Sequence, residues 1–518
     1  MGLWSRVFGG LPRAQARIGQ GYEGSRLGRR LRGWVAERRT INALLASGGD
    51  QLRARARQLC RENPYAANAC EAFTAAAVGA GIKPSSLVAD ADTRAAIQRA
   101  WLAWTDDADA DGITDFYGLQ ALAARAMFEA GEVFIRFRPR RPSDGLSVPL
   151  QIQLLESEML AFTLNEPAGN GNVIREGIEF DAIGRRVAYH FYKSHPGEIY
   201  PVIFDFSYSR VPATEVLHLY KPLRPGQIRG QPQITPSMVR LYLLDLYDDA
   251  ELDRKRVAAM FAGFITKKTS ESDLPIPTDP GSLGPLAETP GPDTAMAQLE
   301  PGMLQVLEDG QTITFSNPAE VGGSYEAFMW RNLLAIASGA GVPYSSVTGD
   351  TSKSNYSSSR ESQVEFRRRI DQVQHLVLVF QMCRPIWIRW METAVMAGAI
   401  PITPRAFVLT RTAFLAVKWI APKWDWVDPW KDRKAEQLAL EMGVKSRSDA
   451  IEAEGEEPEA NDLRIQADRR REIAMDLGFR PVTIRENVNI GAQAATPDEA
   501  VKAARDGGDT RDDPQATS

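Results

Sequence analysis

The chain has 518 residues, with 61 basic and 66 acidic side chains and 44% apolar residues. This length and composition predict two or more domains with hydrophobic cores, and they exclude both a disulfide-stapled miniprotein and a wholly disordered chain. The formal net charge of −5 argues against a general basic nucleic-acid binder, because such proteins displace phosphate counterions with clustered lysine and arginine. Any contact with DNA is therefore expected to be local or weak.

The spacing of cysteine and histidine predicts neither a disulfide framework nor a metal site. Cys60, Cys70 and Cys383 form no CxxC pair, and the four histidines show no ligand spacing such as HExxH. The N-terminus lacks the apolar core of a signal peptide, and no stretch approaches the roughly 18 apolar residues that span a bilayer. We therefore expect a soluble protein of a reducing cytosol, with no metal, no cofactor and no membrane partner.

The first part of the chain is predicted to be a basic arm followed by helices. Residues 1–40 carry nine arginines and two glutamates, which is typical of a mobile arm. Helical periodicity runs over residues 51–78 and ends at GAGIKP, and a second helix is predicted around residues 101–104. A capped helix is expected over residues 116–130, ending at Gly131.

Alternating isoleucine, valine, phenylalanine and tyrosine predict strands in the next hundred residues. The runs are EVFIRFRP, LQIQLLE at 150–156, a pair of strands within 176–192 joined by a short loop at AIG, and VIFDFSY at 202–208. Together with the preceding helices they predict an α+β domain over residues 50–235.

A long amphipathic helix is predicted to begin at Thr235 and Pro236, a capping residue followed by a proline. Charged residues, Asp245, Asp248 and Asp249 among them, occupy much of one side. We expect one packing face and one solvated face on a rod of about 40 Å. The predicted packing stripe comprises Val239, Tyr242, Leu243, Leu246, Ala250, Val257, Met260, Phe261 and Phe264.

A proline-rich insertion separates this helix from a second one. Residues 267–300 hold six prolines and three glycines, which predicts a loop or a disordered insertion. A β stretch at 302–315 and a helix from Tyr325 to Ala340 follow. The next segment, 344–360, is polar and serine-rich and is predicted to be a mobile loop.

The last part of the chain is predicted to be mostly helical. Ser358 and Glu361 have the spacing of a capping box for a helix of roughly 35 residues with a kink before Pro385. A basic helix around 463–476 follows an acidic stretch, and residues 490–518 are predicted to be disordered.

Two motifs resemble ligand sites without completing them. DADADG at 107–112 matches the first half of a calcium loop, but the twelfth position is Gly118, where a bidentate glutamate is required. The other interpretation is a solvated turn that leads into the helix capped by Asp115. TGDTSKS at 348–354 has the composition of a phosphate loop but lacks the upstream glycine and the preceding strand, so a nucleotide site is not predicted.

Three further features have structural interpretations beside functional ones. His218 lies in the apolar run EVLHLY and is predicted to be a core or interface histidine and not a catalytic one. The arginines at 367–369 fit a solvated helix face, with a phosphate-facing role as the alternative. Four of the eleven tryptophans fall within residues 418–432, where prolines and aspartates favour packing or subunit contact over stacking on bases.

Six segments of the chain carry distinctive motifs, among them GVPYSSVTGDTSKSNYSSSR and WDWVDP. The segments are 53–84, 109–136, 216–232, 299–318, 341–360 and 424–429. Taken together they resemble the portal proteins of lambda-type tailed bacteriophages, over about residues 20–480. The resemblance implies a ring, usually of twelve subunits, at one capsid vertex, through which double-stranded DNA passes, and it implies no catalytic centre.

The resemblance also implies a portal fold of the α+β class, with an α+β wing, a two-helix stem, a small β-containing clip and a helical crown. The expected parts are a basic N-terminal arm at 1–49, the wing at 50–235, a stem helix at 236–264, a clip with the proline-rich insertion at 265–324, a second stem helix at 325–341, a tunnel loop at 342–358, a long kinked helix with wing return and crown at 359–480, and a disordered tail at 481–518.

Candidate site residues follow from these parts. The tunnel loop implies DNA-channel positions, among which Lys353 would form a ring of positive charge; the alternative is an exposed lysine without a contact. Acidic stem positions facing the channel would repel phosphate and keep DNA from sticking. The channel candidates are Ser352, Lys353, Ser354, Asn355, Asp245, Asp248 and Asp249, and the candidates for the oligomer interface are Leu246, Trp424 and Trp426.

The partners implied by the resemblance are further copies of the chain, double-stranded DNA in transit, a terminase, the major capsid protein, and head-completion or tail-connector proteins. The expected location is the portal vertex of the virion, and the host cytoplasm during assembly. Since the chain has no Walker motif, ATP hydrolysis is expected elsewhere. Two other classes stay open: a phosphate- or nucleic-acid-processing enzyme, and a monomeric DNA-binding module that uses the basic arm and the tryptophan cluster.

Overall fold

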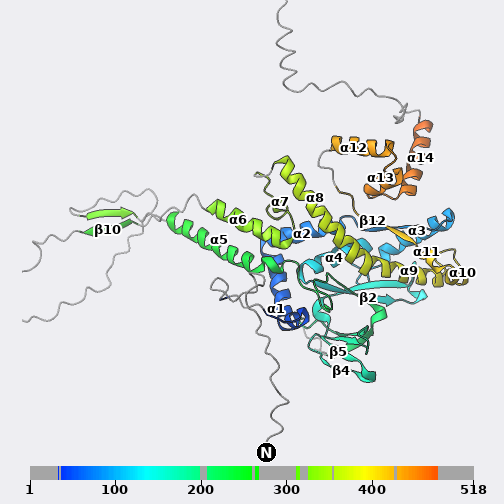
Figure 1. Cartoon of the computed structure of the whole chain (residues 1–518), viewed down its shortest axis with the longest axis horizontal. Coiled ribbons are helices and arrows are strands. Elements are labelled where there is room, and N and C mark those ends of the chain that lie inside the picture. The colour runs from blue at the N-terminus through cyan, green and yellow to red at the C-terminus, as the bar shows by residue number, and fades with distance from the viewer. Residues whose placement is uncertain are drawn as a thin grey trace, which may run out of the picture. The chain divides into compact units, whose positions relative to one another are not determined.

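The computed structural model describes residues 33, 37–198, 207–259, 263–267, 311–315, 325–352, 355–424 and 429–475. The chain divides into two compact units, residues 1–455 and 456–518. Helices and strands are mixed in the first unit, as the α+β class requires (Figure 1). The described part of the second unit contains α14, Pro458–Ala474. No helix among the described residues is both long and apolar enough to cross a bilayer.

The first two helices differ from the sequence-based prediction. α1 spans Ile41–Glu62 and α2 spans Pro64–Val78, so the helix expected from residue 51 begins earlier, within the range assigned to the arm, and is broken once. Thr40 caps α1 by accepting the N–H of Ala43. The break falls at Asn63, which caps α2 in front of a proline that has no N–H to continue the ladder of α1.

The next two helices confirm the prediction. α3 spans Ala91–Asp107, and α4 spans Phe116–Glu129, with the Asp115 carboxylate accepting the N–H of Gly118 at 2.7 Å. Gly131 follows with φ of +86°. A Cβ there would lie 2.3 Å from the carbonyl carbon of Gln231, so the turn needs glycine for both its conformation and its space.

Two antiparallel sheets follow. The three-stranded sheet places β2 between β3 and β9, and its strands are Glu132–Pro139, Leu150–Leu155 and Val216–Tyr220. The five-stranded sheet runs in chain order through β4 (Glu166–Pro167), β5 (Val173–Arg175), β6 (Ile178–Phe180), β7 (Arg186–Tyr192) and β8 (Tyr208–Pro212). The predicted strands at β2 and β3 and the β6–β7 hairpin are confirmed. Most of the strand expected at 202–208 lies outside the described residues, which resume at 207. The strand β8 begins at the last of the expected positions, Tyr208.

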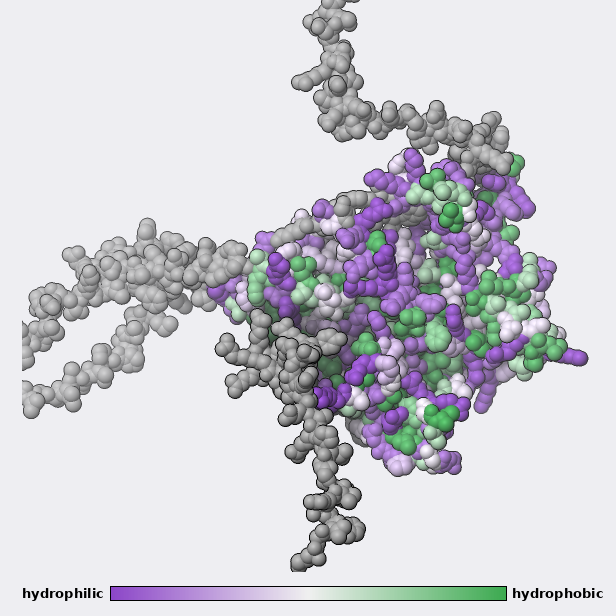
Figure 2. Space-filling model, viewed as in Figure 1, coloured by the Kyte–Doolittle hydropathy of each residue, from purple (hydrophilic) through white to green (hydrophobic). Residues whose placement is uncertain are grey.

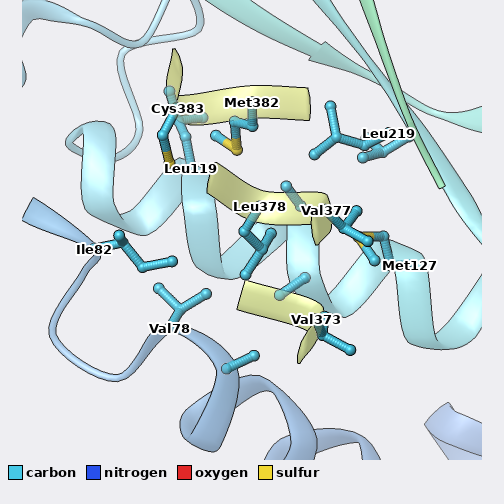
Figure 3. Close-up of a cluster of buried hydrophobic side chains, with 14 of the residues drawn as sticks. Val78, Ile82, Leu119, Met127, Leu219, Val373, Val377, Leu378, Met382 and Cys383 are labelled. Atoms are coloured by element: carbon cyan, nitrogen blue, oxygen red, sulfur yellow. The ribbon is translucent and has the colours of Figure 1, made fainter. Parts of the chain in front are cut away.

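The three-stranded sheet is buried on both faces over part of its length. Ile135 and Phe137 of β2 belong to the main core beneath the helices. Phe134, on the other face of the same strand, belongs to a smaller core shared with the five-stranded sheet. Figure 3 shows the main core where the end of α2, α4, β9 and a long helical segment meet, with Val78, Leu119 and Leu378 pointing toward one another.

That helical segment runs through three elements. They are α8 at Tyr356–Val373, a π-helix at Gln374–Cys383 and α9 at Arg384–Ala397. The irregularity expected before Pro385 is this π-helix, in which the N–H of Arg384 reaches the carbonyl of Val379, five residues back. Pro385, the next residue, has no N–H with which to continue the five-residue hydrogen-bond spacing, so the π-helix ends at this point.

The predicted capping box at the start of this segment was wrong. Asn355 caps α8 by accepting the N–H of Ser358 at 2.8 Å, and the Ser358 hydroxyl accepts the N–H of Asn355 at 3.2 Å. The helix therefore begins two residues before Ser358, because an asparagine side chain satisfies its first free N–H groups.

The other elements complete the described chain. The remaining elements of the first unit are β1 (Lys83–Ser86), which pairs with β12 (Val417–Ile420); β10 (Gly263–Lys267), which pairs with β11 (Gln311–Phe315); and the helices α5 (Met238–Ala259), α6 (Tyr325–Ala340), α7 (Tyr344–Thr348), α10 (Pro404–Leu409), α11 (Arg411–Leu415), α12 (Pro429–Glu441) and α13 (Arg447–Ala453). The basic helix expected at 463–476 is α14, which starts earlier. Residues 268–310 and the tail from 476 lie outside the described residues.

A buried ionic cluster ties β2 and β9 of the three-stranded sheet to the segment after β9. Glu132 of β2 is fully buried and accepts hydrogen bonds from Arg229 at 2.8 Å, His218 at 2.9 Å and Ser157 at 2.7 Å. The N–H of Gly230 donates to the same carboxylate at 2.7 Å. Burial alone would raise the pKa of Glu132, but Arg229 and His218 hold it well below its ordinary value. The prediction that His218 is a core histidine is confirmed.

The cluster makes stability depend on pH. Burial lowers the pKa of His218 to about 4, while the unfolded chain takes up this proton near pH 6.5. Between these values the unfolded state binds more protons, so stability falls as the pH drops through the window, by roughly 3 kcal/mol in total. Thermal unfolding midpoints measured across this window are expected to fall less steeply for His218→Gln than for the wild type. If the midpoint fell equally steeply with pH in both proteins, His218 would not be the source of the pH dependence.

Candidate functional site

α5 and α6 lie side by side, as expected of two stem helices (Figure 1). The Tyr247 ring of α5 packs on Phe328 of α6 with centroids 4.7 Å apart, and the Ser237 hydroxyl before α5 donates to the carbonyl of Ile336 at 2.8 Å. The bounds of α6 confirm the prediction. α5 begins at Met238 after a short 3₁₀ turn and ends at Ala259, so the helix predicted over 236–264 was too long. Its 22 residues span about 33 Å at 1.5 Å per residue, and Phe264 of the predicted stripe lies in β10.

The first part of the apolar stripe, predicted as the packing face of the helix with Leu246 at the oligomer interface, is exposed in the subunit. Val239, Tyr242, Leu243 and Leu246, here named the α5 stripe, are exposed by 72%, 58%, 57% and 49%. The face that packs carries Leu241 and Leu244, which are buried. The physical reason is that α5 has two apolar faces, and the one with Leu241 and Leu244 meets the rest of the subunit. The α5 stripe is left without a covering element in the described chain.

The three acidic stem candidates lie in different surroundings. Asp248 accepts a hydrogen bond from the hydroxyl of Tyr325 on α6, and this bond raises the pKa of Tyr325 to about 12. Asp245 accepts from the Asn63 amide at 3.3 Å, at the junction of α1 and α2. Asp249 is exposed. The first two therefore bond within their own subunit, and a channel-facing role for the three stays a prediction.

The segment expected to be a tunnel loop is partly helical. α7 occupies its first half and is anchored by Val347, which is buried and whose carbonyl accepts from Asn68 at 3.1 Å. Ser352 is exposed and donates its N–H to Asp350 at 2.8 Å, while Asn355 serves as the cap of α8. Lys353 and Ser354 lie outside the described residues. A helix precedes Gly349, as expected, whereas a phosphate loop follows a strand.

Of the two tryptophans predicted at the oligomer interface, only Trp424 is described, and it contacts its own chain. Its indole N–H donates to Asp371 of α8 at 3.3 Å, and the Arg367 guanidinium lies over its ring at 5.4 Å. Arg369 pairs with Glu365 of the same helix. Trp426 lies outside the described residues. These contacts show a packing role for Trp424, and an interface role for the pair stays a prediction.

The DADADG motif forms the turn that was the alternative to a calcium loop. The buried carboxylate of Asp109 accepts the N–H groups of Asp111 at 3.0 Å, Ile113 at 2.9 Å and Thr114 at 3.2 Å. These three bonds shape the turn that leads into α4, and the bidentate glutamate of a calcium loop is replaced by Gly118.

The structure brings together two groups of side chains of the types that ligate metals. The sequence did not reveal these groups, because their members are separated along the chain. Glu156, Glu158 and His195 lie close together, but Arg57 pairs with both glutamates at 3.1 and 3.0 Å. The other group is Cys60, Cys70 and Glu129, where the carboxylate pairs with Arg125 at 3.7 Å. Both carboxylate groups are thus neutralised by arginine, and the arrangement is that of ion-pair clusters.

Comparison with known proteins identifies the family. The profile of the phage portal protein, lambda family, matches residues 27–374. The probable portal protein of Halomonas phage phiHAP-1 is 26% identical over 385 residues, covering 74% of this chain and 71% of that protein. The portal protein of Escherichia phage N15 is 23% identical over 458 residues, covering 82% of this chain and 84% of that protein.

Among solved structures, a chain from the neck of an empty gene transfer agent particle aligns with a TM-score of 0.43 at 15% identity, covering 79% of this chain and 93% of that one. The family assignment comes from the sequence comparisons, because the family profile covers well over half of the chain. The chain belongs to the lambda family of phage portal proteins, and it is a structural portal protein and not an enzyme.

Proposed function

We propose that copies of this chain close into a ring around an axial channel that conducts double-stranded DNA at one vertex of the capsid, with twelve as the expected number of subunits. The observation that carries the proposal is the exposed α5 stripe, on a helix whose other face is packed within the subunit. Residues at positions i, i+3, i+4 and i+7 form a continuous apolar face, which is stable when another surface covers it.

A neighbouring copy is the proposed cover of this face. In a cyclic ring each subunit presents one surface to the next subunit and a different surface to the previous one, so every copy uses its α5 stripe once. Around a closed ring no stripe stays exposed. An isolated monomer would leave the four side chains of the α5 stripe in water.

The tunnel loop is proposed to line the channel. Lys353, once per subunit, would form a ring of positive charge close to the DNA phosphates, and exposed stem carboxylates such as Asp249 would keep the contact weak. Weak contacts fit transport, because each phosphate contact must break when the duplex advances.

The proposed partners beyond DNA and further copies are a terminase that docks on the clip at 265–324, the major capsid protein, and head-completion or tail-connector proteins. The proposed location is the portal vertex of the virion, after assembly in the host cytoplasm. Membership in the portal family supports these partners. The absence of a Walker motif from the sequence supports ATP hydrolysis by a separate motor.

Electron microscopy and native mass spectrometry of the purified full-length chain test the proposal. The expected result is a closed ring with a central hole and a mass that is an integral multiple of the 57.2 kDa subunit. A single-subunit mass at micromolar concentration, with no rings in particles, would reject it.

Lys353→Ala is expected to leave ring formation unchanged and to lower the amount of DNA packaged or retained in each particle, since it removes one positive charge per subunit from the channel. Lys434→Ala, on the exposed side of α12, is the matched control. Packaging assays with both variants check this expectation. Equal DNA content in the Lys353→Ala, control and wild-type particles would remove the channel role of the loop.

A further inference from the structure

Three arginines form a row along the middle strand of the three-stranded sheet. Arg136 and Arg138 lie in β2 and Arg140 directly follows it, so alternation along the strand places the three on one side. The intervening Phe137 is buried on the other side, beneath the helices. Along the arginine side, burial decreases from Phe134, which the second sheet covers, through half-buried Arg136 and Arg138 to exposed Arg140.

Neutral side chains hold two of these guanidinium groups. The Nε of Arg138 donates to the side-chain oxygen Oε1 of Gln153 at 3.0 Å, and the Nε of Arg140 donates to Oε1 of Gln151 at 2.7 Å. The antiparallel register of β2 and β3 brings both glutamines to this side of the sheet. A glutamine fixes the direction of a guanidinium group and leaves its charge in place.

The glutamines are themselves held by the turn before α4. The Gln151 amide donates to the carbonyls of Asp107 at 2.8 Å and Asp109 at 3.0 Å. The Gln153 amide donates to the Asp111 carboxylate at 2.9 Å. Two of the three guanidinium groups are therefore held in place, and the Asp111 carboxylate is bonded to the amide of Gln153.

The charge of the row is not neutralised within the described chain. None of the three arginines forms an ion pair with a carboxylate there, whereas buried Arg229 and half-buried Arg389 both do. Burial lowers the pKa of Arg138, the neighbouring charges of Arg136 and Arg140 lower it further, and the Asp111 carboxylate opposes them without reversing the shift. Like charges side by side on a sheet destabilise it, so an anion that binds the row gains from relieving this repulsion.

We infer that the arginine row, Arg136, Arg138 and Arg140, binds the phosphate backbone of duplex DNA. Alternate residues in a strand are about 6.6–6.8 Å apart, which is comparable with the separation of successive phosphates along one DNA strand. A guanidinium group matches a phosphate through two parallel hydrogen bonds. The geometry alone indicates that the row binds an anionic surface. The choice of DNA over an acidic protein as that surface rests on the proposed function.

The expected contribution is small and sensitive to salt. Each phosphate contact with B-DNA contributes about 0.9 to the slope of log affinity against log salt, so three contacts contribute about 2.7. A fourfold rise in salt would then weaken this part of the binding about 40-fold. A contact of this kind lets DNA leave readily when the salt concentration rises.

The test compares two triple variants of the full-length chain. One is Arg136→Gln, Arg138→Gln and Arg140→Gln, and the control is Arg469→Gln, Arg470→Gln and Arg471→Gln on the exposed surface of α14, with the same change of charge. Fluorescence anisotropy with a short labelled duplex is measured between about 50 and 200 mM salt. The row variant is expected to lower the slope by about 2 to 3 and the control to retain the wild-type slope.

Two results would overturn the inference. One is a wild-type slope in the row variant, or the same loss in both variants, which would mean that only net charge matters. The other is row-dependent binding of polyglutamate that is tighter than binding of the duplex, which would assign the row to an acidic protein. Circular dichroism confirms that each variant is folded, and micrographs record whether rings form. Rings without row-dependent binding reject this inference alone, whereas missing rings reject the proposed function.

Discussion

Leu246→Asp is expected to abolish ring assembly and to leave the subunit folded. Leu246 is 49% exposed in the subunit, so the substitution costs little there, but in an assembled ring it places an unpaired carboxylate inside an apolar contact. A burial cost of about 3 kcal/mol weakens each contact more than about a hundredfold. The defect recurs at every contact of the ring. Sedimentation velocity is expected to show monomers with a wild-type circular dichroism spectrum.

The matched control is Ile183→Asp, which makes the same kind of change at a 74% exposed position in the turn between β6 and β7. It is expected to form rings as the wild type does. Normal rings of Leu246→Asp would mean that the α5 stripe is not the contact. An unfolded Leu246→Asp subunit would mean that this side chain packs within its own chain.

Local signals in the sequence were sufficient for elements whose ends carry their own stop and start residues. Asp115 and Gly131 mark the two ends of α4, and Gly341 with the nearby Pro343 marks the end of α6. Strand alternation was equally clear in β2 and β3. In each case the residues that decide the boundary lie within a few positions of it, which is why a single sequence reveals them.

The orientation of α5 could not be read in the same way. Its sequence has two apolar faces, one with Leu241 and Leu244 and the other with Leu243 and Leu246. Periodicity shows that both exist, but only the positions of α1 and α6 determine which face packs in the subunit. The face with Leu243 and Leu246 was predicted to be a packing face, with Leu246 at the oligomer interface, and the structure leaves it exposed in the subunit.

Some residues of the candidate site could be recognised from local sequence, and others depend on the tertiary structure. Asn355, predicted in the channel loop, caps α8, and this could have been recognised from the preference of asparagine for helix starts. The arginine row is visible as alternating arginines in RFRPRR, but its meaning depends on Gln151 and Gln153. Those glutamines lie 11 and 15 residues away from Arg140 and Arg138 and reach them only through the strand register.

Glu132→Gln is expected to lower the free energy of unfolding of the first unit by about 3–5 kcal/mol, the cost of breaking a buried ion pair from one side. The substitution leaves Arg229, whose side chain is 2% exposed, without its main counter-charge, and the more distant Glu176 is 3.9 Å away. A carboxamide also turns an acceptor into a donor among groups that already donate: Arg229, Ser157 and the N–H of Gly230.

The control for this variant is Glu365→Gln on α8. Glu365 is 65% exposed and pairs with Arg369 one turn away, so its loss is expected to change stability by less than about 1 kcal/mol. Urea unfolding followed by tryptophan fluorescence compares the two variants. Because the Glu132 cluster joins β2, β9 and the segment after β9, its loss should loosen the three-stranded sheet. Equal unfolding midpoints for both variants would show that Arg229 finds another partner.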